Sequence, residues 1–187
     1  TFTYFYIYVM VNKDDFPFKK MGSRAWFRRE AGSYGKYVCG LNRLHHFDKV
    51  EIIQITHPDE SYKTLEEMSL YVQSLLQKLG LHYRVLRLCG GDMGFTSALT
   101  YDMEVYSAAQ EKWLEVSSVS CFETFQSNRL KLRFKNDDGK MQYAHTLNGS
   151  ALALPRIVAA LLENNQTDSG IEMPEVLRPY LGFDRID

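Results

Sequence analysis

The sequence lacks several features that would assign it to a specialised class of protein. It has three cysteines and no Cys-x-x-Cys pair, which argues against a disulfide scaffold or a four-cysteine zinc site. Its longest apolar run, residues 2–11, is too short to span a bilayer. Its 22 Lys and Arg almost balance 23 Asp and Glu, which excludes a whole-molecule basic field but not a local basic groove. These absences predict a reduced, cytoplasmic protein with no membrane partner.

What remains is the composition of an ordinary globular domain. The chain has 187 residues, of which 45% are hydrophobic and 24% charged, and this is enough to bury a core. Length alone predicts a single domain. The chain starts at Thr1 rather than at methionine, directly before a strand-like run, so we expect it to be part of a longer protein.

Short β-rich segments dominate the expected secondary structure. The ranges 24–30 and 43–56 flank a loop with three glycines, which predicts a hairpin whose loop is long enough to reach a ligand. Many strands in series with few helices predict an α+β fold, a mainly antiparallel sheet with flanking helices. Strands are expected at residues 2–11, 24–30, 43–56, 83–89, 101–106, 113–118, 130–135 and 141–146.

Two helices are predicted among these strands. Residues 61–79 place apolar side chains at spacings of three and four, and Gly80 marks the end. Residues 150–165 are apolar nearly all round, so we expect this helix to be buried, with Pro155 tolerated only near its first turn. Arg156 is a charge on that apolar helix. It needs an anionic partner, either a ligand or an internal carboxylate.

The expected strand 24–30 ends in Arg28, Arg29 and Glu30. Because side chains alternate along a strand, Arg28 and Glu30 share one face and Arg29 points the opposite way. A guanidinium beside a carboxylate suits a nucleotide, since the first binds phosphate oxygens and the second accepts a hydrogen bond from an amine. An ordinary ion pair on a solvated face is the alternative.

The returning strand carries a second candidate surface. The odd positions from Arg43 to Glu51 spell RHFKE and share one face, whereas Leu44 and Ile52 belong to the other. Phe47 lies at the centre of the odd face, where its ring can stack on a base. The sequence therefore predicts a ligand-binding floor here, with a purely structural polar face as the alternative.

Other motifs differ in how much chemistry they indicate. Glu115 and the hydroxyls that follow it in EVSSVS (115–120) could hold Mg²⁺ that arrives with phosphates, or could form a serine-rich turn. The cysteines and the five histidines show no metal-ligand spacing. The glycine-rich range 90–94 lacks the Lys-Ser/Thr of a P-loop and is predicted to be a turn.

Taken in order, these segments resemble the catalytic domain of the bacterial-type seryl-tRNA synthetases, which are class II enzymes. The ordered set is far more specific than any one of its members, and it runs almost to the end of the chain. It consists of FRREAGSYGK (27–36), GLNRLHHFDKVE (40–51), GDMGF (91–95), TYDMEV (100–105), EVSSVS (115–120), HTLNGSALALPR (145–156) and PEVLRPY (174–180).

The resemblance implies a set of site residues. Arg28 and Arg156 would act in catalysis on the phosphates of ATP, and Phe47 would stack on adenine. Glu115 and Ser118 would carry Mg²⁺, and a zinc ion is not expected. Serine would be recognised by Glu51, Asn148 and Ser150. The implied ATP-binding residues are Arg28, Arg29, Glu30, Arg43, Leu44, Phe47, Glu115, Val116, Ser117, Ser118 and Arg156.

The resemblance also implies partners for the intact protein. It would activate L-serine with ATP, transfer it to tRNA(Ser) and act as a homodimer. Motif 1, which forms the dimer, the Thr-x-Glu serine-binding loop and the helical arm that grips tRNA would all lie upstream of Thr1. We therefore expect the chain by itself to be inactive or nearly so.

Two departures from the family leave alternatives open. Residues 28–51 resemble the family's motif 2, and its loop has Tyr37 and Cys39 where the family usually has Asp and Arg. Because that loop faces the tRNA acceptor end, the changes allow an enzyme that passes the amino acid to a carrier protein. The second alternative is a non-catalytic paralogue that acts as a binding or regulatory module. The first ten residues match the family poorly.

Overall fold

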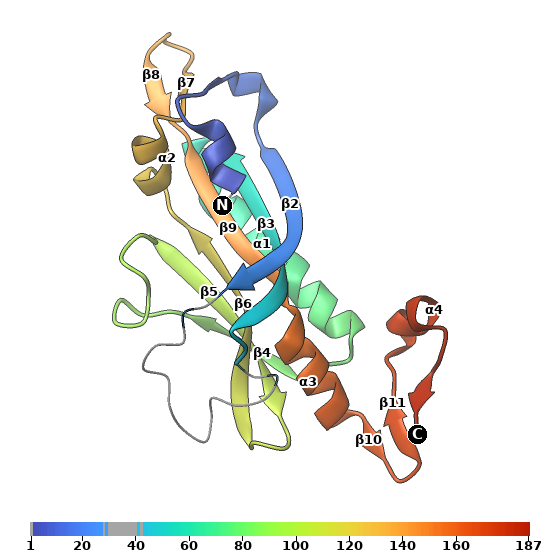
Figure 1. Cartoon of the computed structure of the whole chain (residues 1–187). Coiled ribbons are helices and arrows are strands. Elements are labelled where there is room, and N and C mark those ends of the chain that lie inside the picture. Colours follow the sequence, from blue (N-terminus) through green and yellow to red (C-terminus); the bar gives the residue numbers. More distant parts are fainter. Residues whose placement is uncertain (1, 28, 30–40, 42) are drawn as a thin grey trace.

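The structure is a computed structural model that describes residues 2–27, 29, 41 and 43–187 (Figure 1). The helical elements are η1 (Phe2–Tyr6), η2 (Lys13–Asp15), η4 (Pro58–Glu60), α1 (Ser61–Lys78), α2 (Phe125–Leu130), α3 (Leu154–Asn164), η5 (Glu175–Leu177) and α4 (Arg178–Leu181). The strands are β1 (Met10–Val11), β2 (Phe18–Phe27), β3 (His46–Thr56), β4 (Tyr83–Arg87), β5 (Leu99–Ser107), β6 (Lys112–Cys121), β7 (Arg133–Lys135), β8 (Met141–Tyr143), β9 (His145–Ala153), β10 (Gln166–Thr167), β11 (Gly170–Glu172) and β12 (Arg185–Ile186).

The centre of the molecule is a six-stranded sheet in the order β2-β3-β9-β6-β5-β4. Every neighbouring pair in this sheet is antiparallel. The expected α+β fold class, a mainly antiparallel sheet with flanking helices, is therefore confirmed.

The main core lies between one face of this sheet and the helices α1 and α3. The periodic side chains of α1 pack here, and Leu65, Val72 and Leu76 are fully buried. From the sheet, Met103 of β5 and Val119 of β6 meet them. Since side chains alternate along strands, the residues between these core positions face the other side of the sheet, which is where the polar motifs gather.

The helix expected at 61–79 is confirmed as α1, and Gly80 follows it with φ +68°, a left-handed conformation that ends a helix without strain. The helix expected at 150–165 starts too early. Residues 150–153 complete β9, and α3 begins at Leu154, which places Pro155 in its first turn. It is not buried all round, because Val158 is 45% exposed.

Residues 2–11 do not form the expected strand. They fold as the 3₁₀ segment η1 followed by two residues of strand, β1, which pairs with β7. An aromatic run becomes a strand only where a neighbouring strand completes its hydrogen bonds. Only Met10 and Val11 find one, and Tyr8 stays 78% exposed.

The remaining boundaries also differ from expectation. The strand expected at 24–30 begins earlier, at Phe18, and the one expected at 43–56 begins later, at His46. The range 141–146 is divided between β8 and β9, and the range 130–135 is strand only from Arg133. Helix α2 was not predicted, because its six residues are too few for a helical period to be visible.

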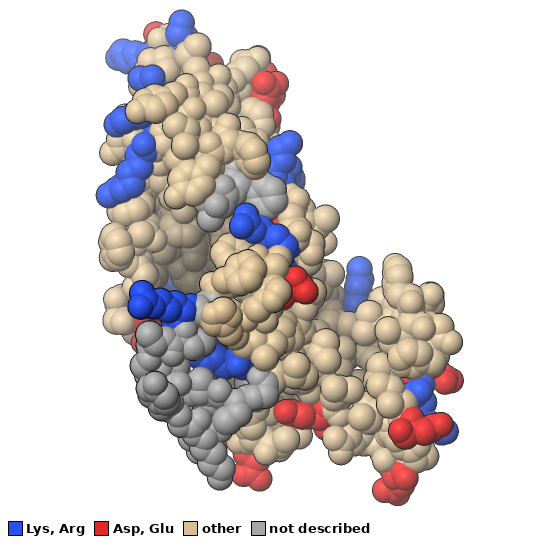
Figure 2. Space-filling view, viewed as in Figure 1, with Lys and Arg blue, Asp and Glu red and all other residues tan. Residues whose placement is uncertain are grey.

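Two small sheets lie outside the central one. The first, β1-β7-β8, packs with the N-terminal segment around a second core that includes Leu132 and Phe134. The second, β10-β11-β12, lies beside α4 at the C-terminal end (Figure 1). Figure 2 shows Lys and Arg side chains along the left edge of the molecule, over α2 and the β7–β8 hairpin. None of the helices in the described ranges has the length and apolarity needed to cross a membrane.

Candidate active site

A cavity of about 120 Å³ opens on the polar face of the central sheet, near the start of α3. Several elements build it: β3 and the residues before it, β6, β9 and the first turn of α3. Its walls carry both charged and apolar side chains, as a ligand with a ring and an anionic group requires. The lining residues are Leu41, Leu44, Phe47, Lys49, Glu115, Val116, Ser117, Ser150, Ala153, Pro155 and Arg156.

Strand β3 supplies the floor through alternate residues, as the sequence predicted. Phe47 and Lys49 line the cavity, and Glu51 follows on the same face. The Lys49 ammonium lies 2.7 Å from Oε1 of Glu51. The Glu51 side chain is only 4% exposed, and its second oxygen, Oε2, has no hydrogen-bond partner among the described residues.

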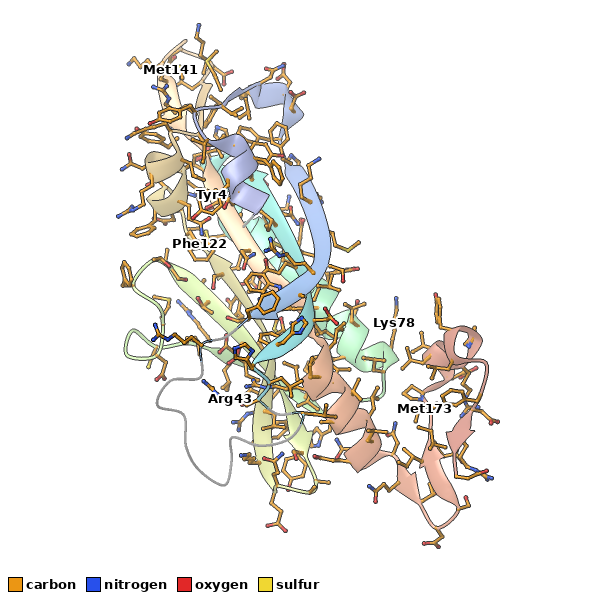
Figure 3. All side chains as sticks on the ribbon, in the orientation of Figure 1. Tyr4, Arg43, Lys78, Phe122, Met141 and Met173 are labelled. Carbon is orange, nitrogen blue, oxygen red and sulfur yellow. The ribbon has the colours of Figure 1, made fainter. Side chains whose placement is uncertain are left out.

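Leu44 was placed on the wrong face by the sequence. It lines the cavity together with Phe47, although strict alternation would separate them. The reason is that β3 begins only at His46, so residues 43–45 do not follow the strand period. Figure 3 labels Arg43 close to the start of β3. Arg43 is half-buried but does not line the cavity.

A bulge in β9 brings the amino-acid and nucleotide candidates to the same side. Ser150 pairs with Glu51 and Ala153 pairs with Lys49, so β9 uses three steps where β3 uses two. The extra residue shifts the alternation, and Ser150 and Ala153 both line the cavity. Pro155 and Arg156 then enter it from α3. Asn148 lies two pairs further along, opposite Ile53, and does not line the cavity.

A second bulge, in β6, arranges the EVSS segment. Glu115 pairs with Glu104, whereas Ser117 pairs with Met103, so Val116 is the extra residue. Glu115, Val116 and Ser117 line the cavity. The hydroxyl of Ser117 is already engaged, because it donates to the carbonyl of Ser150 at 2.5 Å.

Ser118 lies next to the cavity rather than in its wall. It pairs with Asp102 of β5 and its hydroxyl forms a hydrogen bond with that carboxylate. Burial raises the pKa of Asp102, the Ser118 hydrogen bond acts in the opposite direction, and the charge of Glu104 raises it further. Oδ1 of Asp102 has no partner among the described residues.

Several charged side chains around the cavity affect the pKa of Glu115. Although its side chain is exposed at the mouth of the cavity, desolvation by the surrounding protein raises the pKa of Glu115, and the neighbouring charge of Asp102 raises it further. The positive charges of Arg156 and Lys49 counteract this. Nη1 of Arg156 donates to the main-chain carbonyl of Glu115 at 2.5 Å. Arg156 is half-buried rather than buried, and its anionic surroundings include an internal carboxylate, one of the two explanations open from the sequence.

The other predicted residues lie at or beyond the edge of the described site. Arg29 is exposed and does not line the cavity. Arg28 and Glu30, and Tyr37 and Cys39 of the motif 2 loop, lie outside the described residues.

Four lining residues were not assigned a role from the sequence: Leu41, Lys49, Ala153 and Pro155. Lys49 lines the cavity, and the RHFKE alternation had already placed it on the correct face. Ala153 and Pro155 also line it, but no sequence signal could identify them, because they depend on the bulge in β9.

Comparison with known proteins gives consistent matches. Residues 1–165 match the family described as tRNA synthetase class II core domain (G, H, P, S and T). The serine–tRNA ligase of Salinibacter ruber is 58% identical over 175 residues, which are 92% of this chain and 41% of that protein. The serine–tRNA ligase of Akkermansia muciniphila is 52% identical over 178 residues, 95% of this chain and 42% of that protein.

Solved structures agree with these matches. The seryl-tRNA synthetase of Pyrococcus horikoshii complexed with ATP is 36% identical with a TM-score of 0.94, covering 100% of this chain and 43% of that one. A prolyl-tRNA synthetase from Giardia lamblia, 13% identical with a TM-score of 0.81 and covering 95% of this chain and 35% of that one, shares the fold alone. The chain thus spans about two fifths of the length of the relatives it matches.

Proposed function

The chain belongs to the family of class II tRNA synthetase core domains, and on that premise we propose that it is the part of a serine–tRNA ligase that binds ATP and serine for activation. One observation carries the proposal. Residues from three separate segments that the family resemblance assigns to ligands line a single cavity: Leu44, Phe47, Glu115, Val116, Ser117, Ser150 and Arg156.

ATP would lie across the floor of this cavity. The ring of Phe47 offers an aromatic surface for adenine, with the main chain at Arg43 and Leu44 beside the base. Attack of the serine carboxylate on the α-phosphate builds negative charge on the phosphate oxygens, and fixed positive groups stabilise that charge without a covalent enzyme intermediate. Arg156 reaches the cavity from α3. Arg28 would supply the second guanidinium.

The residues around Glu115 fit a magnesium ion that enters with ATP. Mg²⁺ prefers one or two carboxylates together with phosphate oxygens and water. Desolvation raises the pKa of Glu115, and the negative charges of Asp102 and Glu104 raise it further. A divalent cation would offset this repulsion. Glu115 and Ser118 would hold the ion, which supplies positive charge at the phosphates when bound. Asp102 keeps the Ser118 hydroxyl oriented through their hydrogen bond.

Serine would bind beside the phosphates, toward Glu51, Ser150 and Asn148. Glu51 and Ser150 are cross-strand partners, so their side chains are neighbours. The buried Oε2 of Glu51 lacks a donor among the described residues, and serine carries donors in its ammonium and hydroxyl. A site built around such groups rejects an amino acid that leaves them unpaired.

The activity of the whole protein follows from the same proposal. It would charge tRNA(Ser) in the cytoplasm and act as a homodimer. We propose that this chain corresponds to the range from motif 2 to the end of the family's catalytic domain, and that the helical arm, motif 1 and Thr-x-Glu loop belong to the remaining length of the relatives. The chain alone would then show no serine-dependent ATP–pyrophosphate exchange at a normal rate.

Calorimetric titration with an adenylate mimic tests the proposal. Seryl sulfamoyl adenosine keeps the serine and adenosine groups and cannot react. We expect it to bind the chain more tightly than AMP does, and more tightly than the alanyl form, which lacks only the hydroxyl. Equal affinity for the seryl mimic and AMP, or no binding of either, would contradict the proposal.

A further inference from the structure

Trp26 and Arg24 on β2 face the same side of the sheet as Lys49 and Glu51 on β3. In the register of the two strands, Trp26 pairs with Phe47 and Arg24 pairs with Lys49. Trp26 had no role in the prediction from sequence, yet its register places it next to the ring proposed to bind adenine. Its indole therefore lies beside the floor of the site, next to Phe47 in register, although it does not line the cavity itself.

Lys49 is held from two sides. Its ammonium lies 2.7 Å from Oε1 of Glu51 and 4.1 Å from the centroid of the Trp26 ring. Its side chain is 18% exposed. An ammonium in this position donates to the carboxylate and meets the negative face of the indole at the same time. A lysine chain that is otherwise flexible is thereby restricted to one arrangement.

This restraint counters a repulsion. Arg24 and Lys49 stand directly opposite each other on neighbouring strands, and like charges in that relation are destabilising. The Arg24 guanidinium carbon is 5.5 Å from the Trp26 centroid, so the indole is near both cations. Without the ring, the repulsion from Arg24 would act on Lys49 against the attraction of Glu51 and the charge of Glu115 alone among its described neighbours.

The consequence reaches Glu51. Once Oε1 is bound by Lys49, the carboxylate cannot rotate freely, and Oε2 keeps a fixed direction. That oxygen is buried and has no hydrogen-bond partner among the described residues. A buried acceptor without a donor is costly, so the arrangement favours a ligand that brings one.

We propose that Trp26 and Lys49 are positioning residues that fix the Glu51 carboxylate, so that Oε2 accepts a hydrogen bond from the donor groups of the bound amino acid. The inference rests on the proposed function, because it assumes that an amino acid occupies this end of the cavity. It adds a specificity role for two residues outside the set predicted from the family resemblance.

The test compares three mimics on the full chain by calorimetric titration. They are seryl sulfamoyl adenosine, its alanyl form without the hydroxyl, and its 3-hydroxypropionyl form without the amine. In Lys49→Met we expect the preference for the seryl mimic over at least one of the other two to fall about tenfold, the size of a charged hydrogen bond. Trp26→Leu should lower the same ratio by about threefold, because it removes only the restraint on the ammonium.

Matched controls separate positioning from folding. Arg24→Met removes the other cation near the indole. The ion pair of Glu51 is with Lys49 rather than with Arg24, so the affinity ratio between the mimics should not change. Lys49→Arg keeps a charged donor and should restore most of the ratio. AMP affinity reports on the nucleotide end and should change less than twofold in Arg24→Met. Lys49 itself lines the cavity, so for the Lys49 variants only the ratio between mimics is compared, because all three share the same nucleotide end. An equal loss for all three mimics in Lys49→Met would overturn the inference.

The two proposals fail in different ways. If the unmodified chain binds the seryl mimic no better than AMP, the proposed function fails and the inference fails with it. If the unmodified chain prefers the seryl mimic but Lys49→Met and Trp26→Leu keep the same preference, only the inference is overturned.

Discussion

The two faces of the central sheet are built from the same strands and differ almost completely in chemistry. One face packs against α1 and α3, and its side chains Met103 and Val119 are fully buried there. The other face carries Ser150 and Glu115, which line an open cavity, and Glu51, which is paired with the lining residue Lys49. Neighbouring residues of one strand face opposite sides of the sheet. A substitution at one position should therefore lower stability, whereas a substitution at the next position should weaken ligand binding.

The comparison explains why the polar face can hold buried or crowded charges. The apolar face supplies the stability of the domain, so unfavourable features of the site, such as the unpartnered oxygen of Glu51 and the raised pKa of Glu115, can persist. Substitutions on the two faces should therefore affect different measurements, and the following predictions test this separation.

The largest effect is expected on the apolar face. Leu65→Ala, at a fully buried position on α1, should lower the free energy of unfolding by about 2–5 kcal/mol, because it removes buried methyl groups and leaves a cavity. Urea denaturation measures this. Leu70→Ala on the same helix, at a side chain 62% exposed, is the matched control and should change the free energy by less than about 0.5 kcal/mol. Similar losses in both variants would contradict the assigned core.

A smaller effect, on binding rather than on folding, is expected at Arg156. Arg156→Ala should weaken ATP binding about 10- to 100-fold, the range for losing a charged hydrogen bond, and should change the unfolding midpoint little. Calorimetric titration with ATP and Mg²⁺ is the measurement. Arg133→Ala, an exposed arginine on β7 outside the cavity, should bind ATP normally. Unchanged affinity in Arg156→Ala would favour the non-catalytic paralogue.

Phe47 should contribute less than Arg156. Phe47→Ala removes the ring proposed to stack on adenine and should weaken ATP binding about tenfold, within the range known for base–aromatic contacts. The affinity for inorganic pyrophosphate should not change, because it has no base. A parallel loss for ATP and pyrophosphate would mean that Phe47 supports the cavity rather than the adenine.

The smallest effect concerns pH. Burial raises the pKa of Asp102 above its usual value of 3.8, so ionisation opposes folding. Its unfavourable contribution is therefore absent at low pH and develops as pH rises through the folded pKa. Asp102→Asn, whose amide oxygen can still accept from Ser118, should raise stability at pH 7 by less than about 1 kcal/mol. The gain should vanish on acidification below the usual value.

Asp137 provides the contrasting case on the periphery. Its hydrogen bond and charge contact with Lys13 lower the pKa of this exposed carboxyl, so its ionised form favours folding at neutral pH. Asp137→Asn should therefore reduce stability at pH 7, and the loss should disappear on acidification. Denaturation curves at pH 7 and at acidic pH test both signs. The same sign for both variants would refute the assigned environments.

The sequence predicted some elements well for local reasons. The helical spacing of Leu65, Val72 and Leu76 was sufficient to predict α1, because the apolar face of a helix is determined by residues within one segment. The alternation of Phe47, Lys49 and Glu51 placed them correctly on one face for the same reason. The expected run at 2–11 failed because a strand needs a partner, and composition does not show whether one is available.

Non-local pairing determined the remaining parts of the site. Ser150 was expected to begin a helix, but β9 continues to Ala153 because its pairing with β3 extends to Lys49. The extra residues in β9 and β6 then change which side chains line the cavity. A bulge exists only as a mismatch between two paired strands, so neither strand alone contains the signal.

By itself, the sequence determined the residues available for chemistry, the helix α1 and the alternation that separates an apolar from a polar face, because each depends on the order of neighbouring residues. The family resemblance had assigned Leu44 and Arg156 to ATP, but the residue patterns did not show where these side chains lie. The tertiary structure decided that Leu44 joins Phe47, that Pro155 and Arg156 reach the same cavity, and that Trp26 contacts the Lys49 ammonium. Those placements depend on strand register and on the bulges, which arise only when segments far apart in the chain pair with one another.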